Sequence, residues 1–483
     1  MSLEEWSRRF EELRAQLSEQ YYNQKAGLPY DKNLMKKLSK QIADLCREFL
    51  EKFNEPRSMY LRCISEVARD ERLSVELEFS EKRMEVIKSD KFTLNGNIVN
   101  WGNWRKFNAT IDDPVKRKEL FDEFLSKANL LVDLAEKRME ISRKVYERYG
   151  LTPLDAYLEF EQLSYDELYS IIMRLGEGAK EKYLKVAEYY APEILGKEKY
   201  EYYDDYYVWR GRIYRPLNKF FEHLDPLTEI SKVLIGLGAK PEKIKVDAED
   251  RPKKSPSAFC FSIRVPDDVR VVYRRVAPFT DFGSVFHEFG HGFHGIMGNP
   301  RDPVWKRYVV PMGVAETFSY LLEYLLEEPL YLKEELKLSD EAIREVINRR
   351  RFMHLSFVTF YAANSIMKME FWKYGYNAEK AARRWQELTK KFFIEVPGEY
   401  WLLHHIMPNY DLYSPSYIIA ALRVTAIIEK LKKDYSERWW KDKEAAKVIR
   451  KMAESRGEFN VKEWKLDPDV YLDKIKDIEL NKT

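Results

Sequence analysis

Cysteine and long apolar runs are scarce in this 483-residue chain. The three cysteines, Cys46, Cys63 and Cys260, are odd in number and share no metal-type spacing, so we expect reduced packing residues and no disulfide framework. Nowhere do about 18 consecutive apolar residues occur, and the N-terminal segment lacks the short apolar run of a signal peptide. The sequence therefore predicts a cytoplasmic protein with no membrane-spanning helix.

An excess of charge of one sign is also lacking. The 82 basic and 80 acidic residues leave a net charge of +2, so no strong field would gather nucleic acid or an anionic membrane. Hydrophobic residues make up 45% of the chain, which is enough for a sizeable core and argues against disorder. Many Lys, Arg and Glu residues with few Gln are typical of ion-pair networks in thermophilic proteins, and we expect such a source.

The first 240 residues predict mostly helices, because apolar residues recur three and four positions apart among charged ones. One such stripe comprises Leu34, Leu38, Ile42, Leu45, Phe49 and Phe53. A second comprises Leu120, Phe121, Phe124, Leu125, Leu131, Leu134 and Met139. Gly and Pro punctuate these segments at residues 27–29, 150–153 and 192–196.

The pattern of apolar residues changes near residue 240, where the turn-rich stretch GAKPEKIKVDAEDRPKKSPS interrupts the helical periodicity. We expect a lobe boundary here, with an N-terminal helical lobe over residues 1–240 and a second lobe over residues 241–483. The segments 258–265 and 269–275 are rich in β-branched and aromatic residues and are joined by PDD, so they predict a β-hairpin. Helices resume with the segment 280–296.

The segment SVFHEFGHGFH places His287 and His291 four residues apart. On a helix this spacing points both imidazoles off one face, about one turn apart, as metal chelation requires. Glu288 is displaced by roughly 100° around the helix axis, so it is free to act as a general base toward water at the metal. The alternative is an amphipathic helix with core histidines, but Gly290 and Gly292 weaken such a helix, and they would let other backbone or substrate come close.

A catalytic zinc normally takes three protein ligands and leaves a position for water. A third histidine six residues after His291 would fit one class of zinc peptidase, but position 297 is Met, and we expect His294 to be a hydrogen-bond partner behind the ligands or a core residue. A glutamate on a following helix is the remaining solution. We prefer Glu316, because its apolar surroundings would bury the carboxylate and demand a cation; its alternative role is a buried salt bridge to Lys or Arg.

Three other downstream glutamates lie toward a charged helix end, where we expect solvation to suffice. They are Glu323, Glu327 and Glu328.

Three blocks of the sequence resemble the thimet oligopeptidase and oligoendopeptidase F group of zinc metallopeptidases, which are gluzincins, with the Taq-type carboxypeptidases as more distant relatives. The first block is SPSAFCFSIRVPDDVRVVYRRV, the second is FGSVFHEFGHGFH followed by GVAETFSYLLEYL, and the third is HHIMPNYDLYSPSY. Together they span roughly residues 240–425. Ala315 and Thr317 flank Glu316 where the carboxypeptidase group has His and Ser, which favours the oligopeptidase branch.

The resemblance implies a neurolysin-like, mostly α, two-lobed fold with a deep substrate channel and a small hairpin or sheet near the zinc helix. It implies that one Zn²⁺ is bound by His287, His291 and Glu316. By the same resemblance, the catalytic residues are Glu288, His405, Tyr410 and Tyr417. Residues expected to contact the substrate are Ala258, Phe259, Cys260, His404 and Tyr413.

Phenol and imidazole donors of this kind would stabilise the negative charge that builds on the carbonyl oxygen during peptide hydrolysis. Pro408 and Pro415 interrupt any helix, so we expect the three tyrosines of the third block to lie on a bent segment. Core packing is the alternative fate of each tyrosine.

The predicted function is therefore hydrolysis of short, unstructured peptides by a zinc metalloendopeptidase. We expect no nucleic-acid or membrane partner, and either a monomer or a homodimer. One rival is a metallocarboxypeptidase, which would need a cation for the terminal carboxylate. Candidate cations are Arg264, Arg274, Arg275, Arg349, Arg350 and Arg351. A second rival is a non-catalytic, zinc-stabilised peptide-binding protein, in which Glu288 would have no evident purpose.

Overall fold

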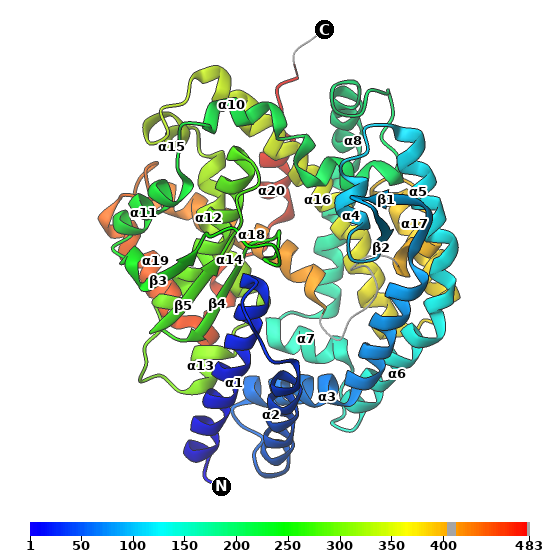
Figure 1. Ribbon diagram of the computed structural model, residues 1–483. Coiled ribbons are helices and arrows are strands. Elements are labelled where there is room, and N and C mark those ends of the chain that lie inside the picture. Colours follow the sequence, from blue (N-terminus) through cyan, green and yellow to red (C-terminus); the bar gives the residue numbers. More distant parts are fainter. Residues whose placement is uncertain (403–411, 481–483) are drawn as a thin grey trace.

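The computed structural model describes residues 1–402 and 412–480 and is built mainly from helices (Figure 1). The chain is 71% helical, with one sheet of two strands and one of three, which confirms the predicted mostly-α class. The N-terminus lies at the periphery of the molecule, at the bottom of the view in Figure 1. Within the described part of the chain, no helix combines the length and apolar character needed to cross a membrane.

The first three helices lie together at the N-terminal end of the molecule (Figure 1). They are α1 (Leu3–Ala26), α2 (Lys32–Lys52) and α3 (Arg57–Val86). The first predicted stripe forms the buried face of α2, where Leu38 and Phe49 are almost inaccessible to solvent. Helix α1 ends at Gly27, whose φ of 73° suits glycine and closes the helix through its N–H.

A β-hairpin follows that the helical reading of the first 240 residues missed. Strands β1 (Lys88–Leu94) and β2 (Asn97–Asn100) pair antiparallel around Asn95 and Gly96. Both turn residues have positive φ, 53° and 78°, as the Asn-Gly dipeptide favours between two paired strands. The Asn-Gly pair was therefore the available sequence signal.

The second predicted stripe is divided between two helices. A 3₁₀ turn at Asn129–Leu131 separates α5 from α6, so the apolar residues of the stripe reach the core from two helix faces. Pro192 lies inside the last turn of α8, which ends at Leu195 and is capped by Gly196. The helices of this region are α4 (Trp104–Asn108), α5 (Pro114–Ala128), α6 (Val132–Glu147), α7 (Pro153–Glu161), α8 (Tyr165–Leu195), α9 (Asp205–Tyr207), α10 (Asn218–Phe221) and α11 (Pro226–Gly236).

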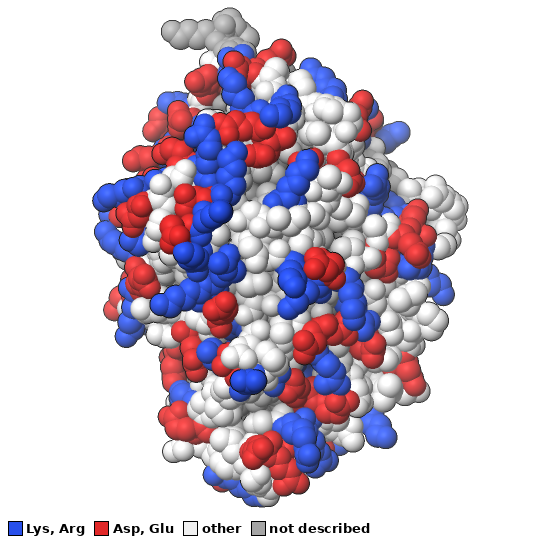
Figure 2. Space-filling view, turned by 90° about the vertical axis from the view of Figure 1, so that its left-hand side faces the viewer, with Lys and Arg blue, Asp and Glu red and all other residues white. Residues whose placement is uncertain are grey.

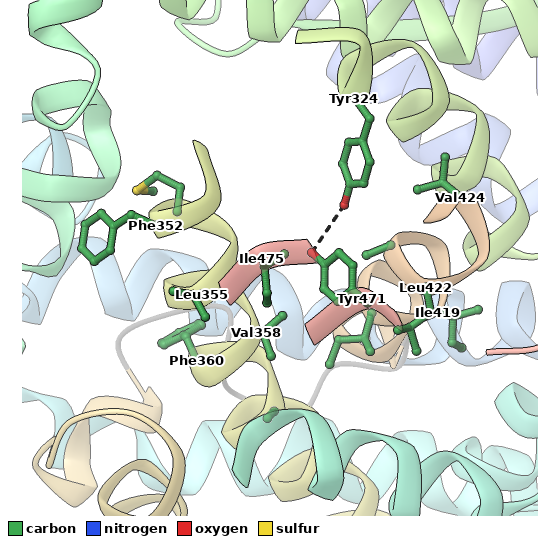
Figure 3. Close-up of a cluster of buried hydrophobic side chains, with 14 of the residues drawn as sticks. Tyr324, Phe352, Leu355, Val358, Phe360, Ile419, Leu422, Val424, Tyr471 and Ile475 are labelled. Atoms are coloured by element: carbon green, nitrogen blue, oxygen red, sulfur yellow. Dashed lines mark hydrogen bonds between the residues drawn. The ribbon is translucent and has the colours of Figure 1, made fainter. Parts of the chain in front are cut away.

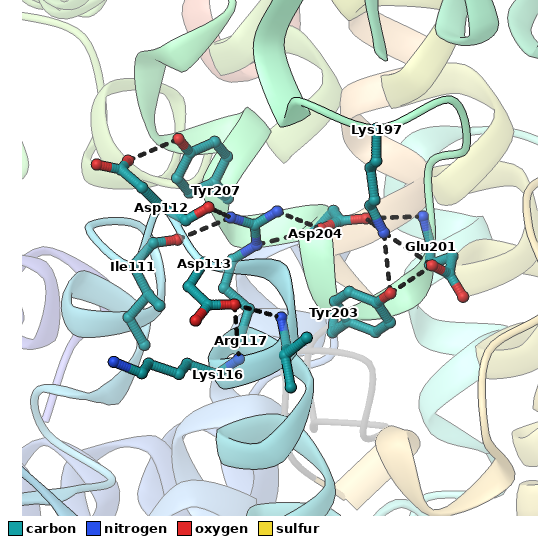
Figure 4. A network of polar contacts seen from close by, with 11 residues as sticks. Ile111, Asp112, Asp113, Lys116, Arg117, Lys197, Glu201, Tyr203, Asp204 and Tyr207 are labelled. Atoms are coloured by element: carbon teal, nitrogen blue, oxygen red, sulfur yellow. Dashed lines mark hydrogen bonds and ion pairs between the residues drawn. The ribbon is translucent and has the colours of Figure 1, made fainter. Parts of the chain in front are cut away.

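A buried ion pair fastens α5 to the 3₁₀ turn before α9. The guanidinium of Arg117 donates to Asp204 at 2.8 Å, and both side chains are fully buried (Figure 4). Lys197 approaches the other carboxylate oxygen of Asp204 at 2.7 Å. Because removing one partner would leave a buried charge uncompensated, this network fixes the relative placement of the two segments.

The predicted hairpin near residue 260 is confirmed as β4 (Phe259–Arg264) and β5 (Asp268–Val272), which pair antiparallel. A third strand, β3 (Ile244–Asp247), arises from the stretch that sequence patterning assigned to turns, and it pairs parallel to β5. The order β3-β5-β4 makes β4 an edge strand. Helix α12 (Pro278–Ile296), predicted as residues 280–296, contacts all three strands.

Long helices complete the C-terminal half. They are α13 (Val304–Tyr308), α14 (Met312–Glu323), α15 (Pro329–Glu334), α16 (Asp340–Tyr374), α17 (Ala378–Phe392), α18 (Tyr413–Asp434), α19 (Lys443–Ser455) and α20 (Pro468–Lys476). Helix α16 is buried along most of its length and contacts α8, α17, α18 and α20. Apolar side chains of α16, α18 and α20 meet around Tyr471, whose hydroxyl lies 3.4 Å from that of Tyr324 (Figure 3).

Two apolar clusters form the core. The smaller one joins α1–α3 to residues of α6 and α7, and the larger one contains buried residues from both sides of position 240. The lobe boundary near that position therefore remains a prediction. On the face shown in Figure 2, basic side chains are interspersed with acidic ones.

Candidate active site

Helices α12 and α14 touch backbone to backbone where the candidate metal ligands lie. A Cβ atom added to Gly290 would come within 2.3 Å of the Phe318 carbonyl oxygen and 2.5 Å of the Ser319 Cα. Only glycine fits at such a distance. One added to Gly292 would lie 2.8 Å from Ile244 of β3. The two glycines therefore let α14 and the sheet approach the helix that carries His287 and His291, which is the close approach of other backbone expected of them.

Three potential ligand side chains converge at this helix contact. The Nε2 atoms of His287 and His291 each lie 3.5 Å from Glu316 Oε2. The three donor atoms all lie within 4.8 Å of one another. Tetrahedral zinc with bonds of about 2.0–2.1 Å separates its ligand atoms by about 3.3 Å. Two imidazoles and one carboxylate in this arrangement therefore fit a zinc ion with one position left for water.

The environment of Glu316 also fits a cation. Its side chain is 2% exposed, and its carboxylate contacts the two histidines, Ser319 and Tyr413. In the described part of the chain no Lys or Arg pairs with it, so the alternative of a salt bridge does not apply. Burial raises the pKa of Glu316, but His291, His287 and the Tyr413 hydroxyl outweigh burial and lower it to about 2. The group is thus an anion without a fixed positive partner.

Glu288 lies between the two histidines and faces the edge strand. The backbone N–H of Cys260, on β4, donates a hydrogen bond to its carboxylate. Burial raises the pKa of Glu288, Glu316 raises it further, and the two histidines act in the opposite direction. A carboxylate whose pKa is raised by burial is suited to taking up and returning a proton.

The sequence reasoning missed a carboxylate behind His287. Glu323 Oε2 lies 2.9 Å from His287 Nδ1, so this nitrogen donates and leaves the Nε2 lone pair facing the metal position. Burial lowers the pKa of His287, but Glu323 and Glu316 outweigh it and raise the pKa to about 9. Arg350 of α16 donates in turn to Glu323 at 3.0 Å. The sequence feature that could have indicated this contact is the spacing of seven residues from Glu316, which returns Glu323 to the same face of α14.

The prediction that Glu323, Glu327 and Glu328 need only solvation was wrong. Glu327 is 3% exposed and Glu328 is 5% exposed, because the 3₁₀ turn Tyr324–Glu327 packs against α16. Each finds a basic partner instead. Arg350 donates to Glu327 at 2.9 Å, and Lys432 lies 2.7 Å from Glu328.

His294 belongs to the core. Its ring stacks on Phe318 with 4.3 Å between centroids, and the residue is 4% exposed. Burial lowers its pKa well below the usual value. Its Nε2 has no hydrogen-bond partner among the described residues. Of the two roles expected for this histidine, the structure supports packing.

Two of the three tyrosines from the third sequence block lie beside Glu316. The Tyr413 hydroxyl donates to Glu316 Oε1 at 2.5 Å, and the Tyr417 ring lies 4.7 Å from that of Tyr413. Burial and then the charge of Glu316 raise the pKa of both phenols, so both keep their protons. The predicted bent segment was wrong for these two residues: both are in α18, because Pro415 occupies its first turn, where no backbone N–H is needed.

The other members of that block, His404, His405 and Tyr410, lie outside the described residues.

The three strand residues expected to contact substrate lie on or next to β4. Ala258, Phe259 and Cys260 are partly buried, and among the described residues β4 pairs with β5 alone. Farther along, Arg14 of α1 donates to the carbonyl oxygens of Ser262 and Ile263 at 2.6 and 2.9 Å. Helix α1 therefore covers one end of β4.

Residues 237–445 match the family model of peptidase family M3. The match covers less than half of the chain, and over this region the protein is similar to that family. The M3 match includes β3–β5, α12, α14 and all of α18, and so all the described candidate residues. Two solved structures share the fold with a TM-score of 0.59 each. A structure of Pz peptidase A with an inhibitor is 14% identical and covers 95% of this chain and 83% of its own. A peptidase from Chlamydophila abortus is 16% identical and covers 92% of this chain and 79% of its own.

No curated protein matches the chain in sequence. The match to the M3 family model nevertheless supports a peptidase role, which implies peptide substrates.

Proposed function

We propose that the protein is a zinc-dependent oligopeptidase that cleaves internal bonds of short peptides. The observation that carries this proposal is the convergence of His287, His291 and Glu316, with 3.5 Å from each imidazole to one buried carboxylate oxygen. His287 and His291 would hold the ion through Nε2 and Glu316 through Oε2. Cobalt or manganese could occupy a site of this donor type as well.

The chemistry that zinc supplies when bound is Lewis acidity toward the scissile carbonyl oxygen. The protein residues provide the remainder. Glu288 takes a proton from the attacking water and passes it to the leaving amine. Glu323 holds the His287 ring in the tautomer that presents Nε2. Tyr417 donates to the developing oxyanion, and we assign His405 and Tyr410 to the same task.

The edge strand β4 is suited to aligning an extended peptide. Main-chain hydrogen bonds to an unpaired strand edge hold a peptide without strong sequence preference. Glu288 is tied to this strand through the Cys260 N–H, so a peptide laid along Ala258–Cys260 would place a backbone carbonyl beside the proposed base. We propose that the substrate channel passes between this edge and α18.

The ion pairs of the candidate arginines favour internal cleavage over carboxypeptidase activity. Every arginine considered as a holder of the terminal carboxylate already has an acidic partner. The pairs are Arg264–Glu12, Arg274–Asp250, Arg275–Asp225, Arg349–Glu193, Arg350–Glu323 and Arg351–Asp477. Binding a substrate carboxylate at any of them would break an existing ion pair.

The test is digestion of a short peptide blocked at both ends, with an N-terminal acetyl group and a C-terminal amide. The zinc-loaded protein should cut it at an internal bond, as seen by mass spectrometry. Glu288→Gln should bind zinc equally and reduce kcat by about 10²–10⁴-fold, since the proton carrier is lost. Release of single residues from free C-termini only, or undiminished turnover by Glu288→Gln, would refute the proposal.

A further inference from the structure

We propose that a cavity next to Glu316 receives a large apolar or aromatic side chain of the substrate, and so determines which peptides are cleaved fastest. This inference rests on the proposed function, because it assigns a role in peptide selection to that same site. The cavity has a volume of about 200 Å³ and is enclosed by α3, α6, α7, the segment before α14 and the start of α18.

The cavity shares its walls with the metal-binding group. Tyr413 lines it and donates its hydroxyl to Glu316 Oε1 at 2.5 Å. Met312 also lines it and precedes Glu316 by four residues on α14, which places both on the same helix face. Tyr413 thus connects the cavity wall to Glu316, and we infer that a substrate side chain beside Glu316 reaches the cavity past this residue.

The size of the cavity suits one ring-sized side chain. An apolar cavity of about 150 Å³ is large enough to hold benzene, so about 200 Å³ accommodates a phenylalanine or leucine side chain. Much of the lining is apolar, including Leu61, Pro153, Phe160, Val309 and Leu412. Transfer of a phenyl group from water into such a lining stabilises the complex through the hydrophobic effect.

The polar groups of the wall bond mainly to one another. The Tyr157 hydroxyl lies 2.9 Å from Ser416 Oγ, and Ser416 Oγ lies 3.3 Å from Glu161 Oε1. Glu161 Oε1 also accepts from the Gly313 N–H at 2.8 Å, and Arg62 is paired with Glu66 at 2.5 Å. An apolar side chain would thus enter without breaking these contacts. Glu161 Oε2 is buried and has no hydrogen-bond partner among the described residues, so a lysine side chain is the competing occupant that the substrate series tests.

Filling the cavity tests its role. Ala156 of α7 lies in the wall and is 6% exposed, so Ala156→Phe would occupy the space that a substrate ring needs. Ala382 lines a separate groove between α17 and the turn Gly398–Leu402, and Ala382→Phe is the matched control. The substrates are end-blocked heptapeptides that differ only in the residue on one side of the cleaved bond, as Gly, Leu, Phe or Lys, in two series for the two sides.

In one series we expect the wild type to cleave the Phe and Leu peptides with a kcat/KM at least tenfold above that of the Gly peptide. Ala156→Phe should lower this ratio at least tenfold, Ala156→Leu should lower it less, and Ala382→Phe should leave it unchanged. An unchanged ratio in Ala156→Phe, an equal loss on all four peptides, or a wild-type preference for Lys in both series would overturn the proposal.

A binding measurement separates this inference from the proposed function. Saturation-transfer NMR of the metal-free protein with N-acetylphenylalaninamide should give a signal for wild type and Ala382→Phe, and a loss of signal for Ala156→Phe. If this pattern holds but no peptide is cleaved, the oligopeptidase proposal fails, whereas the binding of an aromatic group in the cavity is supported. If peptides are cleaved but neither the ratio nor the NMR signal depends on residue 156, the cavity proposal fails alone. Thermal unfolding of each variant verifies that it is folded.

Discussion

The close contact between α12 and α14 makes Gly290→Ala a sensitive probe of the site. The added methyl would lie 2.3 Å from the Phe318 carbonyl oxygen, whereas non-bonded atoms prefer about 3.5 Å. Both nearest atoms are backbone, so the helices must separate by about 1 Å. Overpacking of this kind costs about 3 kcal/mol, against about 1 kcal/mol gained from replacing Gly by Ala in a helix. The net loss of unfolding free energy is about 2 kcal/mol.

Gly283 provides the control within the same helix. A Cβ at Gly283 meets nothing within 4 Å, so Gly283→Ala should stabilise the protein by about 1 kcal/mol. The two variants should therefore differ by about 3 kcal/mol. With an unfolding entropy of about 2.1 cal/mol/K per residue, this difference corresponds to about 3 °C in Tm for a chain of this length. Thermal unfolding of the metal-free proteins, followed by circular dichroism, measures it.

The same variants report on the metal ligands. A separation of about 1 Å would move Glu316 relative to the two imidazoles, while metal–ligand distances tolerate only about 0.2 Å. We expect zinc affinity to fall at least tenfold in Gly290→Ala and to stay at the wild-type value in Gly283→Ala. Equal Tm values for the two variants, or equal zinc affinities, would refute the reasoning that Gly290 sets the distance between the helices.

Two further predictions concern buried carboxyl groups. Glu323→Ala removes the acceptor of His287 Nδ1 and should lower zinc affinity about 10–100-fold, as measured by competition with a chelator. The control is Glu334→Ala, which removes an Arg-paired carboxylate of α15 and should leave zinc affinity unchanged. Equal zinc affinities of the two variants would contradict this prediction. Burial raises the pKa of Asp205 to about 7, so the folded protein binds a proton there that the unfolded chain, with a pKa of about 3.9, has released. The contribution of this group to the free energy of unfolding is fully present below about pH 4. It falls by up to about 1.4 kcal/mol per pH unit as the pH rises to 7. Asp205→Asn should flatten that dependence in urea unfolding from pH 4 to 8, and an unchanged slope would rule the assignment out.

The local chemistry of the site could be predicted from the sequence because it depends on spacing within single helices. The four-residue interval between His287 and His291 fixes two side chains on one face whatever the rest of the chain does. Glu316 could be chosen because a carboxylate among apolar neighbours needs a cation. The enrichment of β-branched and aromatic residues on either side of the PDD turn predicted the hairpin next to α12 for the same local reason.

The parts that could not be predicted depend on contacts between distant segments. The pairing of Glu323 with His287 spans 36 residues and requires the approach of α12 to α14, which only the neighbours of Gly290 reveal. Burial of Glu327 depends on Arg350 of α16, which no local pattern connects to it. The Asn95-Gly96 turn is different, since its signal was present in the sequence and was outweighed by the surrounding helical periodicity.

Anomalous diffraction at the zinc absorption edge, from crystals of the zinc-loaded protein, tests the central claim most directly. We predict one ion within about 2.2 Å of His287 Nε2, His291 Nε2 and a Glu316 oxygen, with Glu288 outside bonding distance. Crystals of Glu316→Ala soaked at the same zinc concentration should show little or no anomalous density there. An ion bound elsewhere, or full occupancy in Glu316→Ala, would contradict the account.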